Sequence, residues 1–216
     1  QAKRLFPMAS SLLNLKFEAI GTTWKIDFFE VVSDPNNLLN EIKARIEAFD
    51  RAYSRFREDS LVSEMARNAG TYTLPEDAEP MMRLYESLYQ ITKGLVTPLI
   101  GQVLVDAGYD ATYSLQPKTL RQPPNWEDVI EYHPPRTITL KQPALLDVGG
   151  LGKGYLIDII GELIWKNGYR SFCVDAGGDL FYRHAANQSF RIGLEHPQHL
   201  EQIIGVAEIH HGSLCG

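Results

Sequence analysis

"LLDVGGLGKGYLID", residues 145–158, places four glycines and one lysine between an apolar run and a segment with helical periodicity. Glycine permits positive φ and lets the backbone approach a ligand closely. Amide groups at a helix N-terminus bind anions, and Lys153 adds a positive charge in the predicted first turn. The helix dipole disfavours a lysine there by a few tenths to ~1 kcal/mol. The segment therefore indicates either an anion site or a glycine-rich turn with a solvated lysine.

A second glycine pair, Gly177-Gly178, lies in "VDAGGDL", residues 174–180, between two predicted strands with carboxylates on either side. Alone, this pattern predicts a hairpin turn. Neither glycine segment has the spacing of a P-loop or of a Rossmann fingerprint. Binding of a nucleotide phosphate therefore requires a different fold.

Working outward from residues 145–158, a helix is expected over about 152–166, ended by Asn167-Gly168. Strands are expected before and after it, because short apolar and β-branched runs alternate with turn residues. They read "TITL", "ALLDV", "SFCVDAGG", "DLFYRH", "SFRIGLEH" and "IIGVAEIH".

The amino-terminal half is predicted to be mainly helical after residues 15–31, which read as a strand pair or a bulged strand. Asp34 and Pro35 are expected to start a long helix. Further helices are predicted over about 76–92 and from Pro98, and the proline-rich residues 116–135 are expected to be irregular. Clustered helices without strict β-α-β alternation predict an α+β fold with an antiparallel or mixed sheet.

Composition excludes several classes of protein. The 216 residues are 44% apolar and 22% charged with a net charge of -6, so no basic face is available for nucleic acid. No apolar run approaches the roughly 20 residues of a transmembrane helix, so no such segment is expected in this chain. Cys173 and Cys215 have no metal-ligand spacing and are expected to be small buried apolar residues.

Five segments occur in an order that resembles one family, the FAD:protein FMN transferases or ApbE-type flavin transferases. "LDVGGLGKGYLID" is similar to that family's D-L-G-G-I-A-K-G-Y-A-V-D, and "SRFREDSLVSEMARN" is similar to its S-x-Y-x-x-x-S-E-L-S-R-L-N. The other three are "IGTTW", "GLVTPLIG" and "VDAGGDL". The resemblance runs from about Leu15 to the last residue. It implies an ApbE-like fold and a single flavin-transferase-like domain over 1–216, lacking the family's carboxyl-terminal part.

The resemblance also implies an activity. Family members cleave FAD, release AMP and attach FMN to a threonine or serine of an acceptor protein, with Mg²⁺. The acceptor is expected to be a membrane redox subunit, and the location periplasmic or membrane-anchored outside the cytoplasm. A flavin-binding module without transfer activity and a glycine-rich structural domain are the alternatives.

Site residues follow from the same resemblance. The backbone carbonyl of Gly150 corresponds to a magnesium ligand, and no catalytic residue is assigned. Side chains that bind the metal lie in the family's carboxyl-terminal part, so this chain alone is expected to have little transferase activity. His210 and His211 are poor magnesium ligands and are interpreted as an exposed pair at a strand end. The positions implied to contact FAD are Ile20, Phe56, Val96, Thr97, Pro98, Asp147 and Lys153.

Overall fold

The computed structural model describes residues 2–4, 11–199 and 202–215. Two compact units make up the chain, one formed by residues 1–46 with 153–216 and the other by residues 47–152. We call them unit 1 and unit 2, and each is described by itself. Helices α1 (Pro35–Tyr53) and α6 (Gly149–Lys166) each contain a boundary between the units.

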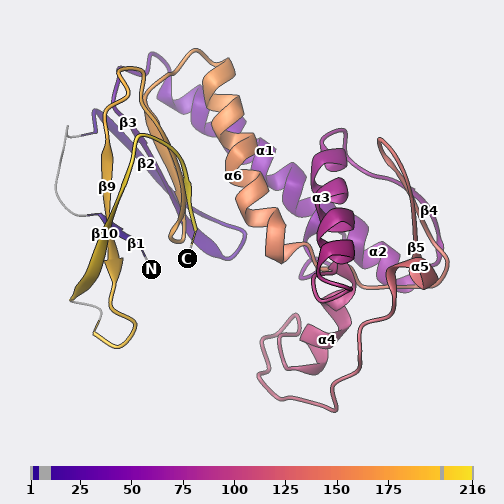
Figure 1. Ribbon diagram of the computed structural model, residues 1–216. Helices are drawn as coiled ribbons and strands as arrows, with labels where there is room; N and C mark the ends of the chain where they lie inside the picture. Colours follow the sequence, from indigo (N-terminus) through magenta and orange to yellow (C-terminus); the bar gives the residue numbers. More distant parts are fainter. Residues whose placement is uncertain (1, 5–10, 200–201, 216) are drawn as a thin grey trace. The chain divides into compact units, whose positions relative to one another are not determined.

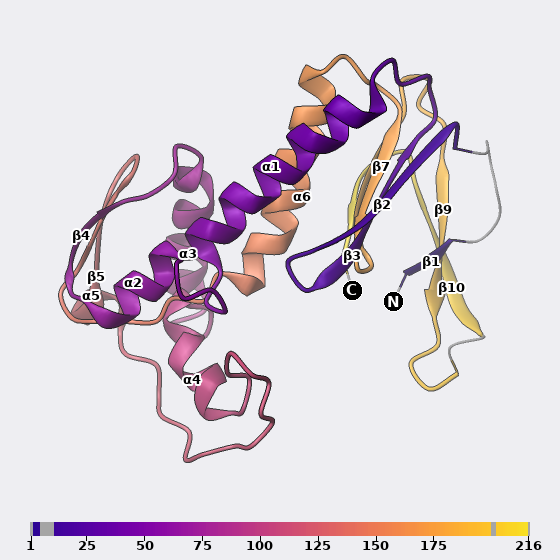
Figure 2. The ribbon, with the colours of Figure 1, turned by 180° about the vertical axis from the view of Figure 1, so that it is seen from behind.

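Unit 1 is built on an antiparallel sheet with the strand order β11-β8-β7-β3-β2 (Figure 1). Its strands are β2 (Leu13–Ala19), β3 (Thr22–Phe28), β7 (Phe172–Ala176), β8 (Asp179–Arg183) and β11 (His211–Leu214). Large side chains that alternate along β3 and β7 are fully buried, which makes one face of the sheet the core. Within unit 1, α6 and the first part of α1 lie side by side along the sheet (Figures 1 and 2).

A second antiparallel sheet in unit 1 has the order β1-β9-β10. It consists of β1 (Ala2–Arg4), β9 (Phe190–Glu195) and β10 (Ile203–Ile209). Ile192 of this sheet packs with Cys173, Leu180 and Tyr182 of the first sheet in one buried cluster. The second sheet therefore covers part of the face that the helices leave free, as Figure 2 shows.

Unit 2 combines short helices with a small antiparallel sheet of order β4-β6-β5. The strands are β4 (Gly70–Thr73), β5 (Ile130–His133) and β6 (Thr137–Leu140). The helices, besides the second part of α1, are α2 (Leu61–Arg67), α3 (Ala78–Ile91), the 3-10 turn η1 (Pro98–Ile100), α4 (Gly101–Asp106) and α5 (Trp126–Val129).

Several sequence predictions are confirmed, among them the α+β fold class. The others rest on signals from residues that are neighbours in the sequence. The Asp34 carboxylate accepts from the Asn37 amide at 3.0 Å and caps α1, with Pro35 as its first residue. Gly94 and Gly168 follow α3 and α6 with φ of 86° and 96°, which only glycine adopts without strain. The strand pair expected over residues 15–31 is present as β2–β3, which ends at Phe28.

Other predictions are wrong. Residues 144–148 are not a strand, because the amides of Ala144 and Asp147 donate to Met65 and Pro98 carbonyls rather than to a ladder. Residues 116–135 are not irregular throughout, since α5 and β5 lie within them. The sequence reading also missed four elements, namely α2, β1, β4 and β11. Cys173 is buried as expected, but Cys215 is exposed.

Candidate functional site

In unit 2, Asp147 fixes the start of α6. Its Oδ1 accepts from the Gly149 amide at 2.7 Å, and its Oδ2 accepts from Arg55 Nε at 2.5 Å. The side chains are only 7% exposed for Arg55 and 12% exposed for Asp147, so little water screens this ion pair. Both carboxylate oxygens are thus occupied within the protein. Arg55 lies in a segment that the sequence reading singled out, yet no signal in it indicated the contact with Asp147.

The glycines of this segment do not have the positive φ that the sequence suggested. The helix begins at Gly149 rather than near residue 152, and none of the glycines at 149, 150, 152 and 154 has a positive φ. A Cβ at Gly149 would lie 2.9 Å from Asp147 Oδ1, and one at Gly152 would lie 3.0 Å from Val148 Cγ2. These two glycines permit close packing. Because the helix starts early, Lys153 lies in its second turn rather than its first.

Gly150 and Gly154 are different, because neither is crowded. The nearest atom to a Cβ at Gly150 would be the Tyr85 hydroxyl at 3.7 Å, and a Cβ at Gly154 would meet nothing within 4 Å. Tyr85 is buried, which raises the pKa of its hydroxyl, while a hydrogen bond with the Leu151 backbone lowers it less. Tyr85 therefore presents a neutral hydroxyl to the first turn of α6, a contact that the sequence did not reveal.

The predicted positions 96–98 lie against Asp147 within unit 2. The Pro98 carbonyl accepts from the Asp147 amide at 2.7 Å. The buried Thr97 hydroxyl accepts from the Leu99 amide at 3.2 Å and caps η1, and the Val96 amide donates to Thr92 Oγ1 at 3.0 Å. The structure thus joins Pro98 and Asp147, which are far apart in sequence.

Phe56, also in unit 2, is 41% exposed. Its ring stacks on that of Tyr113, with ring centroids 5.2 Å apart and an interplanar angle of 12°. The Arg55 guanidinium lies over the Phe56 ring, 4.1 Å from the centroid. Arg55 therefore connects Phe56 with Asp147.

In unit 1, Lys153 forms an ion pair with Asp179, whose carboxylate Oδ2 lies 2.8 Å from the lysine Nζ. The side chain of Lys153 is 37% exposed and that of Asp179 is 14% exposed. Asp179 follows the turn Gly177–Gly178, whose φ values of 65° and 100° favour glycine. A Cβ at Gly177 would lie 2.2 Å from Thr22 Oγ1, so the β7–β8 turn closes tightly onto β3.

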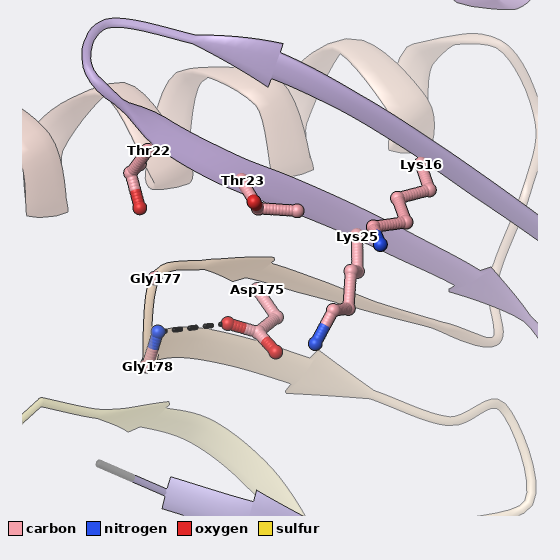
Figure 3. A pocket seen from close by; sticks show the side chains of 7 residues that line it. All are labelled: Lys16, Thr22, Thr23, Lys25, Asp175, Gly177 and Gly178. Atoms are coloured by element: carbon pink, nitrogen blue, oxygen red, sulfur yellow. Dashed lines mark hydrogen bonds between the residues drawn. The ribbon is translucent and has the colours of Figure 1, made fainter.

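A polar pocket of about 280 Å³ lies beside the same turn (Figure 3). In the strand register, Lys25 is opposite both Lys16 and Asp175, so these three side chains share one face of the sheet. Asp175 Oδ1 accepts from the Gly178 amide at 3.0 Å. Ala176, the residue after Asp175, is opposite Asp179, so the pocket lies on the opposite face from the Lys153 pair. It is lined by Lys16, Thr22, Thr23, Lys25, Asp175, Gly177 and Gly178.

Ile20, the remaining predicted FAD contact, occupies the two-residue turn between β2 and β3. It is half-buried with φ of 45°, and Gly21 follows with φ of 75°, as in a type I′ hairpin turn. Its backbone is therefore fixed by the hairpin. The predicted positions divide between the units, with Ile20 and Lys153 in unit 1 and the others in unit 2.

The described residues contain no group of three or more His, Cys, Asp or Glu side chains that fits a metal ion. Gly150 is exposed, but the nearby Asp147 carboxylate is already bound on both oxygens. Among the described residues, no cluster of this kind lies at Gly150. His210 Nδ1 lies 3.0 Å from the Asn187 carbonyl and the His211 ring packs edge-on against Phe181, so these histidines have local partners. Among the helices of the described ranges, none has the length and apolarity to span a membrane.

Comparison with known proteins places these features in a family. Residues 20–216 match the ApbE family. An FAD:protein FMN transferase of Treponema pallidum is 25% identical over 177 residues, which cover 75% of this chain and 49% of that protein. The chain thus spans about half the length of this curated relative.

Solved structures agree on the fold. The flavin transferase ApbE of Vibrio cholerae superposes with a TM-score of 0.74 at 18% identity, over 86% of this chain and 64% of that one. The ApbE protein of Thermotoga maritima gives a TM-score of 0.75 at 18% identity, over 93% of this chain and 68% of that one. Since the family match covers most of the sequence, the chain belongs to the ApbE family.

Proposed function

We propose that the protein is an FAD:protein FMN transferase. The observation that carries this proposal is the family match over residues 20–216, together with the similarity to a transferase of that name. In the reaction, a threonine or serine hydroxyl of an acceptor protein attacks the phosphorus of the FMN half of FAD. The phosphoanhydride bond breaks, AMP leaves, and the hydroxyl proton passes to solvent.

Residues of this chain support binding of the dinucleotide. Lys153 is partly exposed and carries a positive charge that interacts favourably with a pyrophosphate. Asp147 acts through position, because it fixes the start of α6 and holds Arg55. The positions Ile20, Phe56, Val96, Thr97 and Pro98 are proposed as further contacts to FAD.

Mg²⁺ is proposed as the cofactor, with the Gly150 carbonyl as one ligand. When bound, the ion neutralises charge on the phosphates of FAD. It normally needs one or two carboxylates as anchors, and the carboxylate near Gly150, that of Asp147, is already engaged by Arg55 and the Gly149 amide. We therefore propose that these 216 residues bind FAD but release little AMP. A flavin-binding module without transfer activity is the second candidate, and the same observation favours it.

The acceptor is proposed to be a membrane redox subunit, and the location to be periplasmic or, as in a lipoprotein, membrane-anchored outside the cytoplasm. The test of function uses the 216-residue chain with FAD, Mg²⁺ and an acceptor peptide that contains threonine, with a serine peptide and an alanine peptide beside it. AMP release is measured by chromatography and the peptide mass by mass spectrometry. FAD binding with little AMP release is the expected result for these 216 residues and fits both candidates, flavinylated peptide supports the transferase alone, and absence of FAD binding contradicts both.

A further inference from the structure

Phe56 and Tyr113 form an exposed pair of stacked aromatic rings in unit 2. The ring centroids are 5.2 Å apart, and the planes differ by 12°. Phe56 is 41% exposed and Tyr113 is 57% exposed, although each ring has apolar faces that are favourably buried. Near-parallel rings at the surface form a platform on which a further planar ring can stack.

Partly buried charged groups hold the Phe56 end of this platform. The Arg55 guanidinium lies 4.1 Å from the Phe56 ring centroid. It donates through Nε to Asp147 at 2.5 Å and through Nη1 to the Tyr109 carbonyl at 2.5 Å. Because the Arg55 side chain is only 7% exposed, its position is determined by the protein rather than by solvent. The ring of Phe56 is therefore supported in one orientation.

A hydrogen-bonded loop holds the Tyr113 end. The Asp110 carboxylate accepts from the Thr112 amide and hydroxyl at 3.0 and 2.8 Å. It also accepts from the Ser114 amide and hydroxyl at 3.0 and 2.6 Å. These hydrogen bonds, those from Ser114 above all, hold the pKa of Asp110 well below its usual range. Tyr113 itself has φ of 50°, a conformation that residues other than glycine seldom adopt.

The loop that carries Tyr113 also meets Arg55, since the Tyr109 carbonyl accepts from this arginine and the Gly108 carbonyl accepts from the Leu115 amide at 3.0 Å. One arginine thus fixes both the loop and the Phe56 ring. The hydrogen-bond network holds Tyr113 at its unfavourable φ. This backbone conformation places the tyrosine ring parallel to that of Phe56. Packing alone does not require this arrangement, because more than half of Tyr113 remains exposed.

We infer that Tyr113, together with Phe56, forms a stacking site for the planar heteroaromatic ring of a nucleotide, and that Tyr113 determines ring affinity. The inference rests on the proposed function for the identity of the nucleotide, FAD. FAD offers two such rings, the isoalloxazine and the adenine, and both share the chemistry that an aromatic platform recognises. Stacking on an aromatic side chain changes nucleobase affinity by about 5- to 150-fold.

Four variants test the role of the Tyr113 ring. Tyr113→Phe keeps the ring, Tyr113→Leu keeps apolar bulk without a ring, and Tyr113→Ala removes both. Leu120→Ala, at a residue that is 58% exposed in the same long connection, is the matched control. Dissociation constants for FAD, FMN and ADP are measured by isothermal titration calorimetry, and the thermal unfolding midpoint is recorded for every variant.

We expect Tyr113→Ala and Tyr113→Leu to raise the FAD dissociation constant by about 5- to 150-fold. Tyr113→Phe and Leu120→Ala should bind as the unaltered chain does, and unfolding midpoints should not change. The FMN and ADP titrations identify which ring stacks. FAD binding that is equal in Tyr113→Ala and the unaltered chain overturns the inference and leaves the proposed function intact. Equal losses of FAD affinity in Tyr113→Leu and Tyr113→Phe also overturn the inference. Absence of FAD binding by the unaltered chain overturns both this inference and the proposed function.

Discussion

The Lys153 ammonium lies 2.8 Å from the Asp179 carboxylate and joins helix α6 to the β7–β8 hairpin within unit 1. Lys153 remains 37% exposed, so an anion can approach it from solvent, but any such anion competes with Asp179. The pair is too exposed to stabilise the fold by more than about 1 kcal/mol. Its main effect is therefore to fix the position of the Lys153 side chain.

Replacement of Lys153 by alanine is expected to weaken FAD binding by ~1 to 3 kcal/mol, the range for a hydrogen bond to a charged group. Asp179→Asn leaves the lysine without its anionic competitor, and this variant should bind FAD at least as tightly as the unaltered chain. Fluorescence titration with FAD measures both. An unchanged dissociation constant for Lys153→Ala removes this lysine from the site.

Loss of Arg55 should destabilise the protein strongly, because it leaves the Asp147 carboxylate, whose side chain is only 12% exposed, without its cationic partner. We expect Arg55→Ala to lower the free energy of unfolding by about 3 to 5 kcal/mol, measured by urea denaturation. Arg51→Ala, in the last turn of α1, is the control, since its pair with Glu47 has side chains that are 63% and 50% exposed. That variant should change stability by less than about 0.5 kcal/mol. Similar effects of the two variants would contradict the assigned burial.

Alanine substitutions at two glycines with positive φ distinguish the effect of backbone strain from that of steric overlap. Gly168→Ala introduces a Cβ with nothing within 4 Å, so only strain of about 1 to 2 kcal/mol is expected. Gly177→Ala adds a Cβ that would lie 2.2 Å from Thr22 Oγ1, and it should lower the free energy of unfolding further. Thr22→Ala in the same chain should recover the excess. If Gly177→Ala lowers the free energy of unfolding no more than Gly168→Ala does, the β7–β8 turn does not close onto β3 as described.

Replacement of Gly154 by alanine is expected to change stability and FAD affinity in opposite directions. It is helical and uncrowded, so Gly154→Ala should raise the free energy of unfolding by about 0.5 to 1 kcal/mol. If the uncrowded side receives a ligand, the same methyl group should weaken FAD binding. Chemical denaturation and FAD titration of one variant measure both quantities. A more stable variant with unchanged FAD affinity would show that the ligand does not approach α6 at this residue.

Acid should loosen the connection after α4. Hydrogen bonds from Arg121, and to a lesser degree Gln102, lower the pKa of Asp106 from 3.8 to about 2. Because the folded pKa is the lower one, the contribution of Asp106 to stability is full above about pH 4 and is lost as the pH falls toward 2. Asp106→Asn should remove this part of the pH dependence. Urea denaturation at several pH values in this range compares the two proteins, and parallel curves would contradict the pairing.

How far the sequence predicts the structure depends on the distance between partners. The cap of α1 is visible because Asp34 and Asn37 are neighbours, and the turn Gly177–Gly178 carries its own signal. The Arg55–Asp147 pair joins residues 92 positions apart, and nothing in either segment predicts it. Residues 144–148 alternate like a strand because Leu146 and Val148 are buried, but their backbone partners are Met65 in α2 and Pro98 in η1. Alternating burial therefore does not by itself indicate that a segment pairs in a sheet.

The β7–β8 hairpin imposes a rule on sequence change. Asp175 and Asp179 flank one two-residue turn and point to opposite faces, one to the polar pocket and one to Lys153. Because side chains alternate along a strand, inserting or deleting a single residue in the turn before β8 would exchange the faces of β8 and move Asp179 away from Lys153. Most hairpins tolerate variation in loop length. In this hairpin a one-residue change would separate Asp179 from Lys153, because the two aspartates lie on opposite faces of the sheet. Engineers who place tags or graft epitopes in this protein should therefore avoid this hairpin.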